Sequence, residues 1–74
     1  MTDQLRRYHY ALGLEKVRGG WKARAVIERP SRAEADKTSL SLVAHHDQAV
    51  AITIDREIHY GDLLDAKTLG MPGR

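Results

Sequence analysis

Residues 8–29 alternate between apolar and polar side chains on both sides of a glycine pair, and this pattern constrains the fold more than any other feature. One apolar row comprises Tyr8, Tyr10, Leu12 and Leu14, and a second comprises Trp21, Ala23, Ala25 and Ile27. Alternate residues of a strand point to opposite faces, so the pattern predicts two strands. Gly19 and Gly20 provide the positive φ of a tight turn. Val26 on the polar face interrupts the alternation, which predicts a β-bulge near the turn.

The chain after this hairpin begins with a helix signal. Pro30 cannot donate to a strand ladder and therefore ends the second strand. Ser31 and Glu34 have the spacing of a capping box, so a helix is expected to start at Ser31. Its end is ambiguous, because residues 38–45 fit both a helical face and a strand alternation. Three Ser and Thr residues within positions 38–41 favour the strand, which gives a helix over 31–37 of about two turns.

The rest of the sequence predicts a second hairpin and a second helix. Residues 49–55 alternate clearly and would pair with residues 38–45. Residues 58–60 are expected to be extended or a short edge strand. Asp62 is a good N-cap and Gly70 a good helix stop, so a short helix is expected between them.

These elements make one α+β domain over residues 1–74, with a four-stranded antiparallel sheet built from two hairpins. A short helix lies between the hairpins and a short C-terminal helix follows them. Residues 1–7 and 71–74 are expected to be flexible.

Composition limits the class of protein. A chain of 74 residues can bury only a small core, and the absence of Cys excludes disulfides and thiolate metal sites. Apolar runs fall far short of the roughly 20 residues that span a bilayer, and the N-terminal residues lack the apolar core of a signal peptide. The sequence therefore predicts a cytoplasmic protein without a membrane partner.

No residue pattern specifies a reaction. The four His residues lack metal-ligand spacing, and the adjacent His45 and His46 would point to opposite faces of a strand. Asp62 and Asp65 suit helix capping better than acid–base chemistry. The Ser and Gly residues match neither a nucleophile elbow nor a phosphate loop. We therefore expect no enzyme activity, metal, cofactor or small-molecule substrate.

Charge is unevenly distributed and points to a recognition surface. Residues 1–29 hold seven basic and three acidic residues, whereas residues 30–74 hold five basic and seven acidic ones. The candidate partner-binding residues are Arg6, Arg7, Tyr8, Lys22 and Arg24. Basic residues beside aromatic rings suit either a nucleic-acid strand or a protein surface, and net charge does not separate these partners. Ordinary solvated charges and core aromatic rings would produce the same pattern.

The basic RRYHY segment, the basic hairpin, the small cysteine-free domain and the lack of a catalytic signature resemble one class of protein. They are similar to small phage-encoded proteins that bind and regulate host bacterial RNA polymerase. This resemblance implies a compact sheet that binds polymerase subunits and modulates transcription, through inhibition of initiation or antitermination, by occupancy. A nucleic-acid-binding module, or an inhibitor of another host or defence enzyme of the anti-CRISPR kind, are the alternatives.

Overall fold

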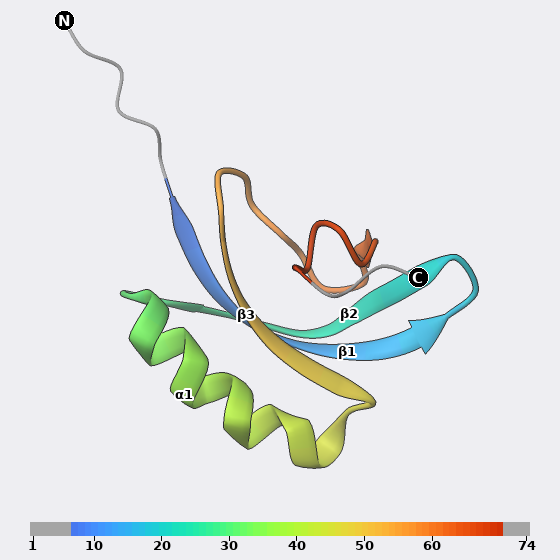
Figure 1. Cartoon of the computed structure of the whole chain (residues 1–74), viewed down its shortest axis with the longest axis horizontal. Helices are drawn as coiled ribbons and strands as arrows, with labels where there is room; N and C mark the ends of the chain where they lie inside the picture. The colour runs from blue at the N-terminus through green and yellow to red at the C-terminus, as the bar shows by residue number, and fades with distance from the viewer. Residues whose placement is uncertain (1–6, 71–74) are drawn as a thin grey trace, which may run out of the picture.

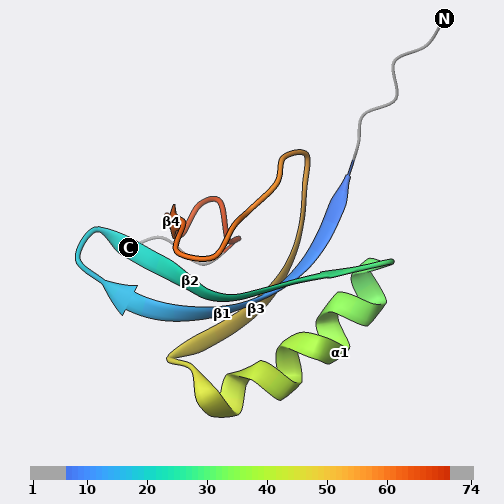
Figure 2. The same cartoon turned by 180° about the vertical axis from the view of Figure 1, so that it is seen from behind.

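A computed structural model describes residues 7–70 as a curled antiparallel sheet covered on both faces. The elements are β1 (Tyr8–Val17), β2 (Gly20–Arg29), α1 (Arg32–Leu42), the 3-10 turn η1 (Val43–His45), β3 (Gln48–Ile54) and β4 (Leu63–Leu64). The strand order is β3-β1-β2-β4. Helix α1 lies against one face of the sheet, and the chain after β3 crosses the other face (Figures 1 and 2). No helix within residues 7–70 is long and apolar enough to cross a membrane.

The β1–β2 hairpin and its bulge are confirmed, but the bulge divides the second apolar row. Gly13 pairs with Ala25 and Leu14 with Ala23, so Arg24 is the extra residue. An extra residue reverses which face the following side chains occupy. Val26 therefore packs against the core on the same face as Leu12, contrary to the expected polar position. Ala25 and Ile27 turn to the face covered by α1.

The main core lies between the sheet and the chain that follows β3. Its buried members are Tyr10, Leu12, Leu14, Ala23, Ile52, Ile58, Leu64 and Leu69. Trp21 packs at its margin, half-buried, with the Lys16 ammonium 4.9 Å from the ring centroid. The predicted strand alternation in residues 8–14 and 49–55 thus placed the core correctly.

Helix α1 starts as predicted but ends later. Ser31 Oγ accepts a hydrogen bond from the Glu34 amide at 3.2 Å, which caps the helix. The expected strand over residues 38–45 is wrong, because α1 continues to Leu42 and η1 follows it. The Thr38 and Ser39 hydroxyls donate to backbone carbonyls one turn earlier, at 3.0 and 2.8 Å. Their polar groups are thus satisfied inside the helix. The second hairpin is accordingly absent, and β3 pairs with β1.

Small residues let α1 approach the sheet closely. Ala11 in β1 and Ala35 in α1 are fully buried, and Ser39 is nearly so. Gly13 lies beneath the His46 ring, where an added Cβ would be 2.7 Å from Nδ1. His46 Nδ1 donates to the Leu42 carbonyl oxygen at 2.9 Å, which fixes the ring over Gly13. A second, thinner layer of packing therefore joins α1 to the sheet.

The predicted C-terminal helix is not found within residues 7–70. Leu63 and Leu64 instead pair with Lys22 and Trp21 as β4. Asp65 Oδ1 accepts from the Thr68 amide at 2.7 Å, so a single turn replaces the helix. This hydrogen bond lowers the pKa of Asp65 below its ordinary value. The expected flexibility of residues 1–6 and 71–74 concerns positions outside the described residues.

Tyr10 is predicted to make the fold less stable at high pH. Burial raises the pKa of its hydroxyl, which accepts from the Ile58 amide at 3.3 Å. The folded-state pKa of Tyr10 lies above the ordinary value of 10.0, so the neutral hydroxyl contributes to the stability of the fold. This contribution is fully present below pH 10.0 and is lost as pH rises through the folded-state pKa. We expect the melting temperature to fall above that pH, and to fall less steeply in Tyr10→Phe. Equal slopes for Tyr10→Phe and wild type would contradict the assignment.

Candidate protein-binding surface

Strand β3 forms an open edge of the sheet. It has seven residues and a single strand neighbour, β1, within residues 7–70. The opposite edge is the two-residue β4, which is too short to offer a comparable ladder. Edge strands expose backbone donors and acceptors that another strand can bind.

The hydrogen bonds of β2 show which backbone groups of β1 point toward β3. The Ala23 amide donates to the Asp62 carbonyl at 2.9 Å, and its carbonyl accepts from the Gly61 amide at 2.7 Å. Both backbone groups of Ala23 therefore point away from its partner Leu14. The Lys16 amide also points toward the β3 side, where it donates to Asp47 Oδ2 at 3.1 Å. Alternation along β1 then directs the backbone groups of Leu14 toward β3.

The same alternation identifies the open groups of β3. Leu14 pairs with Gln48, and the uninterrupted register continues to Tyr8 opposite Ile54. Even-numbered residues of β3 thus exchange hydrogen bonds with β1. The amides and carbonyls of Ala49, Ala51 and Thr53 point outward, away from the sheet. They form a ladder of free donors and acceptors at the spacing that an added strand requires.

Strand β3 carries few of the features that protect natural edges. Its sequence, QAVAITI, has no charged residue and no Pro, and its register with β1 has no bulge. Charges, Pro and bulges are the usual means of preventing edge pairing. The nearest charge comes from α1: the Arg32 guanidinium lies 3.5 Å from Thr53 Oγ1, at one end of the strand.

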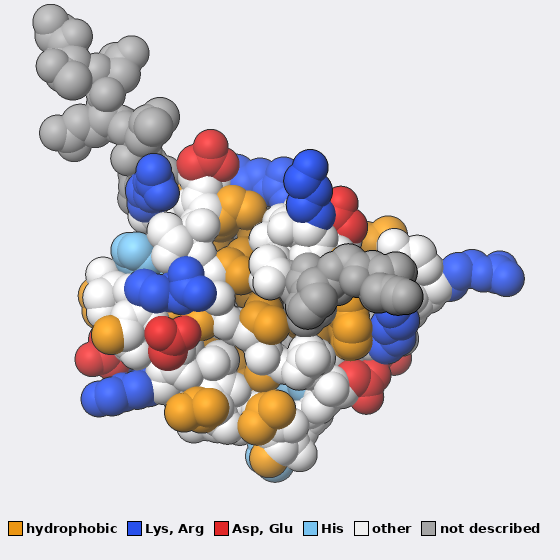
Figure 3. All heavy atoms as spheres, in the orientation of Figure 1, with side chains coloured by type: hydrophobic (Ala, Val, Ile, Leu, Met, Phe, Trp, Pro, Cys, Tyr) orange, Lys and Arg blue, Asp and Glu red, His pale blue; other side chains and the backbone are white. Residues whose placement is uncertain are grey.

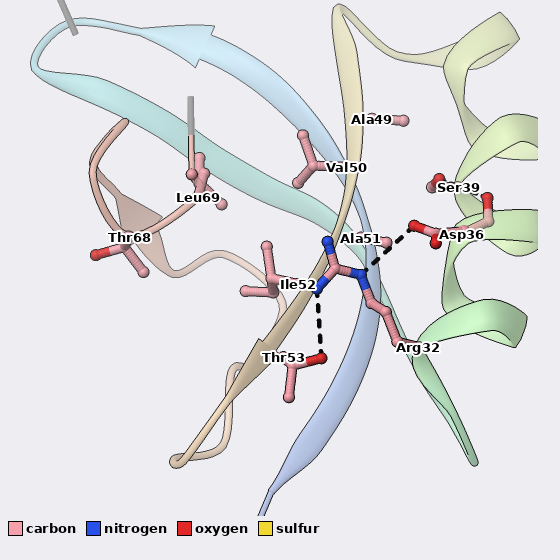
Figure 4. Close-up of a pocket in the computed structure, with 11 residues that line it drawn as sticks. Arg32, Asp36, Ser39, Ala49, Val50, Ala51, Ile52, Thr53, Thr68 and Leu69 are labelled. Carbon is pink, nitrogen blue, oxygen red and sulfur yellow. Dashed lines mark hydrogen bonds and ion pairs between the residues drawn. The ribbon is translucent and has the colours of Figure 1, made fainter. Parts of the chain in front are cut away.

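The edge lies in a groove of about 520 Å³. Figure 4 shows β3 between two different walls. The polar wall comes from α1 and comprises Arg32, Asp36 and Ser39. The opposite wall comprises Thr68, Leu69 and Gly70, and Val50 and Ile52 lie on its side of the sheet. An extended segment bound here would therefore meet polar groups with one set of alternate side chains and aliphatic groups with the other.

Two exposed apolar residues, Leu40 in α1 and Val43 at the start of η1, continue this row. Leu40 follows Asp36 by four residues, and Val43 follows Leu40 by three, so they lie on the same side of the helix as Arg32. Leu40 is 73% exposed and Val43 is 49% exposed. Hydrophobic side chains are visible on the lower surface of the molecule in Figure 3, over the region of α1. Large exposed aliphatic groups beside an open edge are typical of interaction surfaces.

Comparison with protein-family models, curated proteins and solved structures gives no match.

Of the predicted site residues near the N-terminal end of β1, the structure describes Arg7 and Tyr8. Arg6 lies outside the described residues, and Arg7 is exposed. Tyr8 is half-buried and stacks on Tyr10, with ring centroids 5.9 Å apart and planes 5° apart. Tyr8 thus contributes to packing at this end of the sheet.

Lys22 and Arg24 lie at the other end of the hairpin. Lys22 pairs with Glu15 in the ladder, seven residues along β1 from Tyr8, which corresponds to about 23 Å. Arg24 Nε donates to Glu15 Oε1 at 2.6 Å, and Nη1 donates to the Tyr60 hydroxyl at 3.3 Å. These contacts raise the pKa of Arg24, with the Glu15 hydrogen bond as the main cause. Among the predicted residues that the structure describes, Tyr8 therefore lies at the opposite end of the hairpin from Lys22 and Arg24.

The His residues do not gather into a metal centre. Within residues 7–70 there is no group of three or more His, Cys, Asp or Glu side chains that could hold a metal ion. His46 is occupied by its bond to Leu42, and His9 Nδ1 lies 2.9 Å from Thr53 Oγ1.

Sequence reasoning missed the edge groove for a specific reason. The alternation of β3 was recognised, but its edge position depends on the sheet order, which local patterns do not reveal. The prediction pairs residues 49–55 with residues 38–45 but gives no order of the four strands, so it does not identify which strand lies at an edge. The available signal was the lack of charge across QAVAITI.

Proposed function

We propose that the protein is a non-catalytic interaction protein that binds another protein by strand addition at the β3 edge. The open ladder at Ala49, Ala51 and Thr53, lying on the floor of the groove, is the observation that supports this most directly. Backbone hydrogen bonds would provide affinity, and the two unlike walls would select alternate side chains of the incoming segment.

Bacterial RNA polymerase is the partner we propose to test first. The choice rests on the resemblance of the chain to small phage regulators of that enzyme. Binding would modulate transcription by occupancy, because a segment paired with β3 is unavailable for its normal contacts. An inhibitor of another host or defence enzyme would use the same edge.

Ala51→Pro tests the proposed edge directly. Proline removes the outward Ala51 amide, whereas the ladder to β1 uses the neighbouring residues, so the fold should be retained. We expect at least tenfold weaker binding to purified RNA polymerase in a titration, which corresponds to about 1.4 kcal/mol. Circular dichroism would verify the folded state.

Ala33→Pro is the matched control for this substitution. Ala33 is exposed in the first turn of α1, where an amide has no acceptor within the helix. Its binding to polymerase should equal that of wild type. Undiminished binding by folded Ala51→Pro would exclude the β3 edge, and absence of binding by wild type would exclude polymerase as partner.

The hairpin end supports nucleic acid as a second candidate partner. Lys16 is exposed over the Trp21 ring and Arg18 is exposed in the adjoining turn, and neither forms an ion pair within the described residues. Phosphate-driven binding would weaken log-linearly with salt as counterions are released. A titration with single-stranded nucleic acid at low salt, compared with Lys16→Glu, separates this candidate from the edge surface. No affinity at low salt would remove it.

A further inference from the structure

We infer that the β3 edge of one molecule pairs with the β3 edge of a second copy, which gives a two-fold symmetric dimer that competes with partner binding. This inference rests on the proposed function only in that both use the same backbone groups. The dimer would join two four-stranded sheets into one continuous sheet.

The open ladder is complementary to itself. An antiparallel two-fold axis at Ala51 places this residue opposite Ala51 of the second copy. It also places Ala49 opposite Thr53 of the second copy, and the reverse. These are the three residues whose backbone groups point outward, so each amide meets a carbonyl in this register.

The side chains fit the same register. On the α1 side only Ala and Thr meet across the new pair, so the ladder itself carries no bulky side chain on that face. On the other side Val50 lies opposite Ile52 of the second copy, a pair of β-branched residues that is favourable in sheets. A shift by one residue would put the aliphatic groups on the wrong face.

Charge does not oppose the pairing. Strand β3 has no charged residue, so symmetry brings no like charges together in the ladder. Arg32 and Asp36 on the groove wall have opposite charges and lie 3.5 Å apart, which leaves this wall without net charge. Like-charge contact is the usual barrier to self-association, and this edge lacks it.

A second copy would also bury apolar side chains that are exposed to water in the single molecule. Leu40 and Val43 continue the helical row of Arg32 and Asp36, and both side chains are exposed. Association of the folded state stabilises it by mass action. Because partner and second copy bind the same groups, self-pairing would lower the concentration of edge available to a partner.

Cysteine cross-linking tests the inferred register, since the chain has no Cys of its own. In the dimer the two Ala51 Cα atoms would be about 5.5 Å apart, within the range of a disulfide. Ala51→Cys should therefore form a covalent dimer under mild oxidation. Ala49→Cys is the matched control, because its two copies would be four residues apart along the strand, or about 13 Å, beyond disulfide reach. Equal or faster cross-linking of Ala49→Cys would overturn the register.

Sedimentation equilibrium tests the dimer without a thiol. The mass of wild type should rise from 8.3 kDa toward twice that value as concentration increases to about 1 mM, whereas Ala51→Pro should remain at 8.3 kDa. A wild-type mass that stays at 8.3 kDa throughout would overturn the inference.

The two proposals fail differently. Monomeric wild type that still binds polymerase through Ala51 would remove the dimer and keep the proposed function. Dimeric wild type that binds no polymerase would remove polymerase as partner and keep the dimer. If both hold, the oxidised Ala51→Cys dimer should lose polymerase binding and regain it on reduction.

Discussion

Leu12→Ala is expected to destabilise the protein by about 2–5 kcal/mol, because it removes a fully buried side chain from the centre of the core. Leu12 lies in the middle of β1, opposite Val26 on one side and Val50 on the other. Both neighbours are fixed in the ladder, so they can collapse only partly into the space left behind. The expected cost therefore includes a cavity as well as the lost burial.

This loss is large for a chain of 74 residues. A domain of this size has a total free energy of unfolding of about 4–11 kcal/mol, so Leu12→Ala should remove a large share of it. Urea unfolding followed by circular dichroism would measure the change. Leu40→Ala is the matched control, since Leu40 is 73% exposed, and its effect should stay within about 0.5 kcal/mol. Similar losses in both variants would place the core elsewhere.

The hairpin could be predicted because its signals are local. Turn glycines, alternating residues and Pro30 act within a few positions of one another, and the same is true of the Ser31 cap. The extent of α1 was not predictable in this way. The Thr38 and Ser39 hydroxyls count against a helix until their acceptors within the helix are known, and the small size of Ser39 matters only because α1 lies close to the sheet.

The end of the chain shows the same limit. Residues 62–70 have the caps of a helix, yet Leu63 and Leu64 pair with β2. Asp62 Oδ2 accepts a hydrogen bond from the His59 amide at 2.8 Å. The Asp62 carboxylate therefore stabilises a turn that precedes the predicted helix. Tertiary pairing overrides local propensity here.

The candidate surface was even harder to predict from the sequence, because it depends on contacts between residues far apart in the chain. The bulge places Arg24 beside Glu15, and this ion pair joins two residues on different strands, which no local pattern reveals. The ladder at Ala51 became visible only from the strand order. Residue types that bind through side chains can be recognised in a sequence, whereas a surface that binds through backbone groups leaves little trace in it.

Gly13→Ala is the second substitution with a large expected effect. Two effects oppose each other in this substitution. The first is favourable: alanine restricts the unfolded chain and stabilises the protein by about 0.4–1 kcal/mol where its methyl group fits. The second is steric. Here the methyl carbon would be 2.7 Å from His46 Nδ1 and 2.8 Å from Cγ. The close contact reaches the inner end of the ring, so a small rotation cannot relieve it. Overpacking of this kind costs roughly 1–3 kcal/mol, and we therefore expect net destabilisation in urea unfolding.

A double-mutant cycle with His46→Ala identifies the cause. His46→Ala alone should destabilise, because it removes the ring and its bond to the Leu42 carbonyl. If contact with the ring causes the loss in Gly13→Ala, adding Gly13→Ala to the His46→Ala background should cost nothing or stabilise. The two effects would then be non-additive by roughly 1–3 kcal/mol. Additive losses would mean that Gly13 is required for another reason, and the close approach of η1 to β1 would not explain the glycine.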